Sequence, residues 1–359
     1  MFNKKKDIFL AWLPFVIFLF VFIVLFVFGT KYDLKISQKL TTNTWPKVSR
    51  DYYPKDIFGT AGEIIGVAPT YLLFSFAGVG MFYYFDVLKL KRLQVILKIL
   101  CVVAVFVGFF LMFRQMIGYL LKHLGEYKIL KDGKWVATEA YQSKKYALYI
   151  TYAFLSVIFS VISMFAGKSL PKKNIKKIAY FIVITGIVAI ISTAMVEVLK
   201  VLANRPRFRT LHALGREDLY RRWYQFDKAR DLTDKNFIVN FEGKLIQIEK
   251  DGYKSFPSGH TCAAGMTFSL LLLPDLFKIK NKEAKMFCYE FSIIFTVGIA
   301  VSRIIAGAHY LTDVLIGGTI PFVLFLLAKE LFITKCKNFK RMVGKYVPKY
   351  EEEFIEILQ

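Results

Sequence analysis

The chain has 359 residues, of which 55% are hydrophobic and 17% aromatic, and its formal net charge is +23. A soluble globule of this size could not bury so much apolar surface, and so apolar a chain is not intrinsically disordered. A charge of +23 usually indicates a nucleic-acid or membrane-surface partner. A polytopic membrane protein explains both features, provided that the basic residues lie in particular loops.

Uncharged segments long enough to cross a bilayer, which takes about 20 apolar residues, recur along the chain. They predict an all-α transmembrane bundle of eight spans, or of six or seven if a weak segment is re-entrant or interfacial. Four spans carry no charge: Ile8–Thr30, Ile64–Phe85, Tyr146–Gly167 and Ile178–Val196. Four more are shorter or carry a charge near one end: about Val95–Ile117, His260–Phe277, Met286–Ile305 and Leu311–Ile333. The first span is longer than a signal-peptide core, so we expect it to be retained.

Lysine and arginine residues concentrate in alternate loops, as the positive-inside rule requires. The loops 86–94, 168–177 and 278–285 are basic and contain only two acids, Asp86 and Glu283. The segments 1–7 and 334–359 are also basic, so we expect both termini in the cytoplasm. By contrast, 208–256 carries ten cations and eight anions. Topology thus accounts for most of the net charge, and no nucleic-acid partner is needed.

Two outer loops contain the pattern of a β-hairpin, a turn between two strand-like arms. The turns are Asp132-Gly133 and Glu242-Gly243, and we expect the hairpins to stiffen their loops. No repeat or linker divides the chain, so residues 1–359 are predicted to form one integral membrane domain, with 208–256 as an extracytoplasmic insertion. A disulfide scaffold and a zinc module are both disfavoured, because no Cys-x-x-Cys pair occurs among Cys101, Cys262, Cys288 and Cys336.

Three polar clusters lie where predicted spans end at the outer side. Charged residues there are costly and are functional candidates by default. The first cluster contains Lys200, Arg205 and Arg207, and the second is Pro257-Ser258-Gly259-His260. The third runs from Ser302-Arg303 through His309 to Asp313. Since all three clusters meet one surface, they can form one site.

These residue types suit phosphoryl transfer. Arginine forks and lysine ammonium groups bind phosphate oxygens, and the helix start at Ser258 and Gly259 offers free backbone amides to an anion. His309 and Asp313 are four residues apart, so on a helix they share a face. Asp313 can then accept a hydrogen bond from one ring nitrogen and leave the other as a nucleophile. His260, on a different span, can protonate the leaving oxygen.

Each cluster taken alone has a simpler explanation. The cations around Lys200 can be an interfacial anchor, and Pro-Ser-Gly can be an ordinary helix boundary. His309 and Asp313 can form a structural pair, a metal half-site or a proton relay. Neighbouring arginine and lysine side chains repel a cation, so we expect no metal and no cofactor.

In this order and spacing, the clusters resemble the signature of the type 2 phosphatidic acid phosphatase superfamily. Its pattern is Lys-x6-Arg-Pro, Pro-Ser-Gly-His and Ser-Arg-x5-His-x3-Asp. All positions match except Phe208, where the family has proline, which puts loop geometry in doubt more than activity. The resemblance covers about residues 178–330. The segment after the first span, from Asp33 to Gln38, is weakly similar to bacterial members.

The resemblance implies a metal-independent membrane phosphatase with a six-helix core, the other two spans being an N-terminal addition. His309 would form a phosphohistidine and be oriented by Asp313, while His260 would be the general acid. Arg205 either assists or only anchors. The phosphate-binding residues would be Lys200, Arg207, Ser258, Gly259 and Arg303.

The leading hypothesis is hydrolysis of a phosphorylated lipid at the outer face of the plasma membrane. Phosphatidate, phosphatidylglycerol phosphate and polyprenyl diphosphate all fit, because a site at bilayer level admits a headgroup whose tails stay in lipid. A soluble phosphate ester is the alternative substrate. A non-hydrolytic transporter of phospholipid or polyprenyl phosphate would share the basic pocket but would not need the pair of His309 and Asp313. Haloperoxidase chemistry with vanadate is disfavoured, because those enzymes are soluble.

Overall fold

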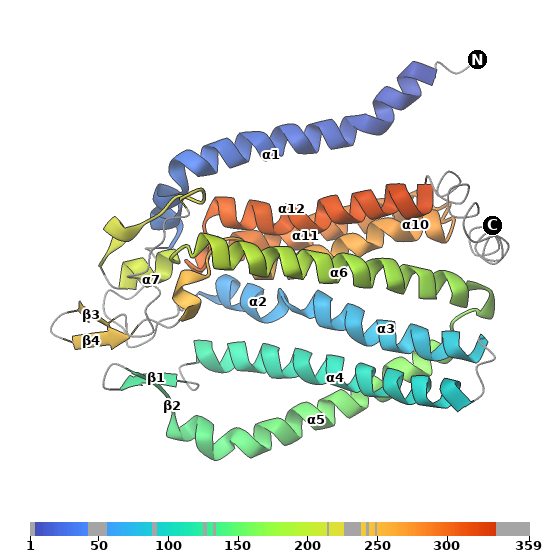
Figure 1. Cartoon of the computed structure of the whole chain (residues 1–359), viewed down its shortest axis with the longest axis horizontal. Helices are drawn as coiled ribbons and strands as arrows, with labels where there is room; N and C mark the ends of the chain where they lie inside the picture. The colour runs from blue at the N-terminus through green and yellow to red at the C-terminus, as the bar shows by residue number, and fades with distance from the viewer. Residues whose placement is uncertain are drawn as a thin grey trace.

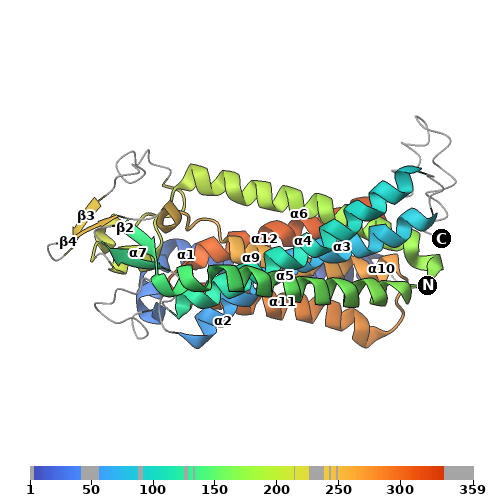
Figure 2. The ribbon, with the colours of Figure 1, turned by 90° about the horizontal axis from the view of Figure 1, so that it is seen from below.

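The computed structural model describes residues 4–41, 56–87, 92–124, 128–131, 134–213, 215–225, 238–241, 244–247 and 250–334. Long helices run roughly antiparallel along one axis, and two small β-hairpins lie at one end (Figures 1 and 2). The predicted all-α transmembrane bundle is therefore confirmed.

Seven helical segments in the described ranges are long and apolar enough to cross a membrane. Many of their large side chains point outward, and Ile190, Val201 and Ile294 are 71%, 75% and 70% exposed. Such faces are stable where lipid tails, not water, surround the bundle, so the chain is an integral membrane protein. The segments are α1 (Lys4–Thr41), α2 with α3 (Ile57–Ile65, Ala68–Val87), α4 (Arg92–His123), α5 (Glu139–Lys168), α6 (Ile175–Ala203), α11 (Lys282–Ile305) and α12 (Leu311–Ala328).

The eighth predicted span, His260–Phe277, is helical but is not one regular helix. It consists of α9 (Gly259–Ala264), the 3₁₀ helix η4 (Gly265–Leu272) and α10 (Leu273–Leu276). A 3₁₀ helix rises about 2.0 Å per residue and an α-helix about 1.5 Å, so the run covers about 31 Å. That length is close to the thickness of the hydrocarbon core, about 30 Å.

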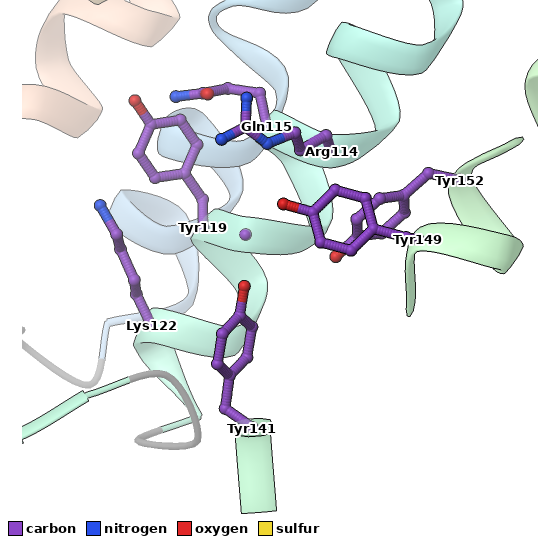
Figure 3. Close-up of a pocket in the computed structure, with 8 residues that line it drawn as sticks. Arg114, Gln115, Tyr119, Lys122, Tyr141, Tyr149 and Tyr152 are labelled. Carbon is purple, nitrogen blue, oxygen red and sulfur yellow. The ribbon is translucent and has the colours of Figure 1, made fainter. Parts of the chain in front are cut away.

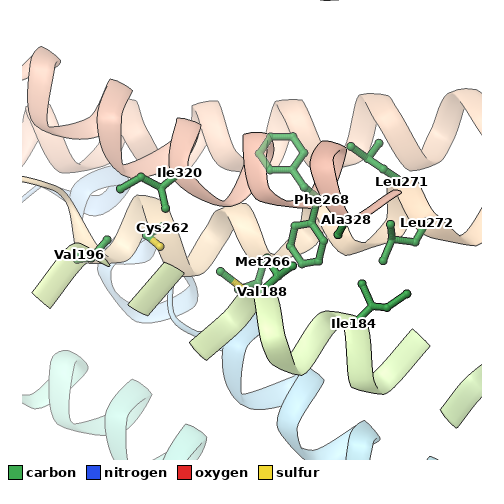
Figure 4. Close-up of a cluster of buried hydrophobic side chains, with 11 residues drawn as sticks. Ile184, Val188, Val196, Cys262, Met266, Phe268, Leu271, Leu272, Ile320 and Ala328 are labelled. Atoms are coloured by element: carbon green, nitrogen blue, oxygen red, sulfur yellow. The ribbon is translucent and has the colours of Figure 1, made fainter. Parts of the chain in front are cut away.

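The main hydrophobic core surrounds this eighth segment (Figure 4). Its side chains interlock with those of α6 and α12, so the three elements that carry the motif clusters are held as one unit. A smaller cluster joins α3 to α4 through Val79, Val105, Phe109 and Met112. The main core consists of Ile184, Val188, Val196, Cys262, Met266, Phe268, Leu271, Leu272, Ile320, Phe325 and Ala328.

Helices α4 and α5 lie at the edge of the bundle, on the side away from α1 (Figure 1). Helix α4 packs on α3 and α5, whereas α1 packs on α11 and α12, and α3 packs on α6. The two peripheral spans therefore come from the middle of the sequence. The expectation of an N-terminal addition is wrong, because α1 is part of the bundle around the motifs.

Both predicted hairpins are confirmed, and they contact each other. Strand β1 (Lys128–Lys131) pairs antiparallel with β2 (Lys134–Ala137), and β3 (Ile238–Phe241) with β4 (Lys244–Gln247). The turn residues themselves lie outside the described ranges, as do Cys336 and the basic tail from 335. The same end of the bundle contains α7 (Phe208–Ala213), η2 (Glu217–Leu219) and η3 (Lys250–Tyr253). The opposite end contains η1 (Lys172–Asn174) and the π-helical turn η5 (Lys329–Thr334).

Gly62 allows α2 to approach α11 closely. A Cβ atom there would lie 1.9 Å from Oγ of Ser302, so Gly62→Ala must push the helices apart. We expect the free energy of unfolding to fall by about 1–3 kcal/mol, the usual cost of overpacking, and the melting temperature in detergent to fall accordingly. The matched control is Gly298→Ala on α11, where an added Cβ meets open space. Equal melting temperatures for the two variants would contradict the close approach.

Candidate active site

The three motif clusters come together at the end of the bundle that carries the hairpins (Figure 1). Helix α6 ends at Asn204, whose left-handed backbone (φ 42°) and N–H to the carbonyl of Lys200 close the last turn. The chain then turns back, which places Arg205 and Arg207 beside the starts of α9 and α12. Ser258 caps α9 by accepting a hydrogen bond from the N–H of Thr261.

His309 lies in the turn between α11 and α12 and is buried. Its Nδ1 is 2.5 Å from the backbone carbonyl oxygen of Ser255. A carbonyl can only accept, so Nδ1 carries the proton and Nε2 keeps its lone pair. The nearer carboxylate oxygen of Asp313 is 3.9 Å from Nδ1. The predicted direct hydrogen bond between His309 and Asp313 is therefore replaced by one to Ser255.

Asp313 acts on His309 through Ser255. Its Oδ2 accepts hydrogen bonds from Oγ of Ser255 at 2.5 Å and from the N–H of Tyr310 at 2.8 Å. The backbone N–H of Ser255 is bonded to the carbonyl of Arg205 at 3.0 Å. Ser255 is thus held at both ends while its carbonyl orients the imidazole. Ser255 could not be predicted from the sequence, because no chemical pattern distinguishes it from other loop serines.

The environment of His309 favours its neutral form. Burial, followed by the charges of Arg207, Arg303 and His260, lowers the pKa of His309 well below its usual value of 6.5. The hydrogen bond to Ser255 acts in the opposite direction but is the smaller effect. At neutral pH the buried imidazole is therefore uncharged, as a nitrogen nucleophile must be.

Arg205 is a buried clamp between distant parts of the chain. Its Nη1 donates to Asp313 at 2.5 Å and to Thr312 at 2.9 Å, and its Nη2 donates to Asp33 at 2.9 Å. Nη2 also donates to the hydroxyl of Tyr220 at 3.1 Å, and Nε donates to the carbonyl of Arg221 at 2.8 Å. These bonds use all five N–H donors of the guanidinium. The geometry therefore favours anchoring over phosphate binding for this residue.

Asp33 connects α1 to this clamp and is itself buried. Besides the bond from Arg205, it accepts hydrogen bonds from the backbone N–H of Thr312 at 3.1 Å and from the Thr312 hydroxyl. Two further contacts join α1 to the same end: Trp223 donates to Thr30 at 3.0 Å, and Gln38 donates to Glu217 at 2.5 Å. The first helix is thus fastened directly to the residues that position the imidazole.

A second buried cluster is rich in positive charge. Arg303 donates to Glu63 at 2.8 Å and to the carbonyl of Gly59 at 3.1 Å. Arg209 lies 3.9 Å from the same carboxylate oxygen, and Arg207 is buried beside them. Two guanidinium groups thus approach the carboxylate of Glu63, and Arg207 adds a third positive charge close to Arg303. Such a concentration of positive charge can stabilise a phosphate. Neither Glu63 nor Arg209 was predicted, since neither belongs to a motif.

Lys200 reaches the start of α9. A Cβ atom on Gly259 would be only 2.9 Å from Nζ of Lys200, so glycine leaves room for the ammonium group next to the backbone amides. Nζ also donates to Glu197 at 2.6 Å. His260 is half-buried, with its ring 5.2 Å from that of Tyr119. In the described part of the chain, no group of three or more His, Cys, Asp and Glu side chains is placed to hold a metal ion.

The sequence model of the PAP2 superfamily matches residues 177–335. This region of the chain is therefore similar to the PAP2 superfamily. It contains all three motif clusters, and its bounds agree with the resemblance inferred over about 178–330. Phe208, which replaces the PAP2 proline, is the first residue of α7, a position that proline also favours. Its buried ring stacks on His212 at 5.4 Å, so the turn into α7 forms without proline.

Two curated relatives carry names with a common chemistry. Lipid phosphate phosphatase 1 of Arabidopsis thaliana is 30% identical over 152 residues, or 41% of this chain and 41% of that protein. Phosphatidylglycerophosphatase B of Bacillus subtilis (strain 168) is 34% identical over 117 residues, or 32% of this chain and 57% of that protein. The chain thus spans about half the length of these relatives. No solved structure matches it.

Removing Asp33 tests the clamp. Asp33→Ala leaves part of the buried guanidinium of Arg205 without a partner, and breaking a buried ion pair costs about 3–5 kcal/mol. We expect a corresponding loss in the free energy of unfolding, measured by denaturant titration in detergent. The control is Asp218→Ala, which removes an exposed pair with Arg216 and should change the free energy of unfolding far less, because solvent screens such pairs. Similar losses for the two variants would show that the clamp does not stabilise the fold.

The charge state of His309 is measurable in the free protein. The chain has four histidines, so His309→Ala assigns the resonances of His309 in a ¹⁵N-histidine NMR spectrum. Because its pKa is lowered, we expect His309 to remain the neutral Nδ1–H tautomer as the pH falls from 8 through its usual pKa of about 6.5. A titration midpoint at or above that value would contradict the buried, positively charged environment.

Proposed function

We propose that the protein is a membrane phosphatase that hydrolyses a phosphomonoester or diphosphate through a phosphohistidine on His309. The observation that carries this proposal is the buried neutral imidazole, whose proton is held on Nδ1, next to a cluster of cations. Similarity to the PAP2 superfamily and the phosphatase names of the two relatives support the same reaction.

In the first step, Nε2 of His309 attacks phosphorus, an N–P bond forms, and the bond to the leaving oxygen breaks. His260 gives its proton to that oxygen. Lys200, Arg207 and Arg303 stabilise the charge on the phosphoryl oxygens. The carbonyl of Ser255 accepts a hydrogen bond from Nδ1–H throughout, and so stabilises the positive charge that develops on the ring. In the second step, His260 removes a proton from water, water attacks phosphorus, and phosphate leaves as the N–P bond breaks.

We infer that the substrate is carried on a lipid. The cation cluster lies where spans end, beside strongly apolar surface: Ile57 and Phe58, next to the Gly59 carbonyl that holds Arg303, are 88% and 48% exposed. A headgroup can reach the cations from there while its tails remain in the bilayer. A soluble phosphate ester would not need this apolar surface.

We propose that the site faces the outside of the plasma membrane, with both termini in the cytoplasm. The basic segments that connect α5 to α6 and α10 to α11 lie at the end of the bundle opposite the site (Figure 1). The start of α1 and the end of α12 lie at that same end (Figure 1). The positive-inside rule assigns the basic end to the cytoplasm.

Substitution of the nucleophile separates hydrolysis from transport. We expect His309→Ala to lower phosphate release from phosphatidate in detergent micelles by about 10³-fold or more, as removal of a nucleophile does in other enzymes. The matched control is His212→Ala, because His212 pairs with Glu217 outside the cation cluster, and it should retain activity within about threefold. Equal release from wild type and His309→Ala would refute the proposal, and lipid binding without turnover would favour a transporter.

A further inference from the structure

A cavity of about 110 Å³ lies between α4 and α5 and has no role in the reaction described above (Figure 3). A water molecule takes about 30 Å³ of liquid volume, so the cavity has room for a group the size of phosphate. Gly118 lines its middle, where an added Cβ would meet open space. The lining residues are Arg114, Gln115, Gly118, Tyr119, Lys122, Tyr141, Tyr149 and Tyr152.

The lining of the cavity suits an anion. Arg114 and Lys122 lie about 12 Å apart along α4, one on either side of Gly118. Their neighbours are a glutamine and tyrosines, which add hydrogen-bond donors, and among the described residues that line the cavity none is acidic. Arg114 is exposed and lies near the outer end of the predicted span Val95–Ile117, so an anion that enters the cavity can reach its charge. Arginine and lysine together with phenol hydroxyls favour phosphate oxygens.

The cavity adjoins the catalytic site on the side of the leaving group. The ring of Tyr119 lies 5.2 Å from the ring of His260, and Nζ of Lys122 lies 5.1 Å from the centre of the same tyrosine ring. His260 is the group that protonates the leaving oxygen in the proposed reaction. The part of the substrate attached to that oxygen must therefore extend past His260, toward Tyr119 and the cavity.

We propose that the cavity binds a second phosphate group in the leaving portion of the substrate. This inference rests on the proposed phosphatase function and specifies its substrate class. The ring of Tyr119 separates the two anion sites, so the second phosphate is joined to the first by a short polyol rather than directly. The phosphodiester of phosphatidylglycerol phosphate meets this requirement, whereas phosphatidate has no second phosphate. Helices α4 and α5 lie outside the matched region 177–335, so this selectivity comes from the peripheral pair.

The test compares kcat/KM for phosphatidylglycerol phosphate and for phosphatidate in the purified full chain. We expect the wild type to prefer the lipid with two phosphates at least tenfold. Arg114→Gln and Lys122→Gln should each lower the ratio of the two values by about tenfold. The control is Lys98→Gln, which lies on the same helix but pairs with Asp86 at the other end and should leave the ratio unchanged. A folding defect lowers both values and not their ratio.

The outcomes distinguish this inference from the function on which it rests. If the wild type hydrolyses both lipids equally, or if neither cavity variant changes the ratio, the second phosphate site is refuted and the phosphatase stands. If the enzyme instead prefers polyprenyl diphosphate over phosphatidate, and this preference is lost in Arg114→Gln, the two phosphates can be joined directly. The argument that a short polyol must separate them is then refuted. If inorganic phosphate alters phosphatidate hydrolysis only when Arg114 is present, and the ratio is unchanged, the cavity binds free anion. If neither lipid releases phosphate, both proposals fall.

Discussion

One buried guanidinium group, that of Arg205, holds the active end of this bundle together. Buried charges are tolerated only when they are paired and fully hydrogen-bonded. Arg205 meets that condition because α1, the loop after α7 and the start of α12 each provide a hydrogen-bond acceptor for its guanidinium. Asp313 can then accept a hydrogen bond from the hydroxyl of Ser255, and the carbonyl of Ser255 can accept one from the imidazole of His309. The orientation of His309, the proposed nucleophile, therefore depends on Asp33, a residue far from it in sequence and outside the region 177–335 that matches the PAP2 superfamily.

The charges around His309 are divided into two groups with different tasks. Arg205 with two carboxylates forms a closed, internally satisfied network on the Nδ1 side of the ring. The second group contains Arg303 and Arg209, which both approach the carboxylate of Glu63, and the nearby Arg207, and in the proposed reaction it provides positive charge for the substrate. The imidazole between them is neutral, so it neither repels the arginines nor loses its lone pair. Charges arranged before the substrate arrives need no reorganisation when it reacts.

The sequence predicted those features that depend on local pattern. The lengths of the apolar runs predicted the spans, and the motif spacing predicted Lys200, His260 and His309 as neighbours. It could not predict contacts across long separations, such as Glu63 with Arg303, 240 residues apart. The prediction of a direct hydrogen bond between His309 and Asp313 was wrong for a specific reason. The i,i+4 argument requires one continuous helix, but α12 begins at Leu311, after His309. The backbone at His309 therefore directs the ring toward the Ser255 carbonyl.

The position of the peripheral pair of helices has a consequence for specificity. The proposed phosphate-binding cations, the proposed nucleophile and its supports come from α1, α2, α6 and the segment after it, the loop before α9, and α9, α11 and α12 with the turn between them. The proposed reaction therefore uses no side chain of α4 or α5. A cation on α4 therefore cannot be explained by the attack on phosphorus. The ring of Tyr119 on α4 lies 5.2 Å from the ring of His260, so in the proposed reaction α4 and α5 meet the substrate only beyond the bond that breaks. On that proposal, changes in α4 and α5 alter which leaving group is accepted and leave the chemistry of phosphoryl transfer intact.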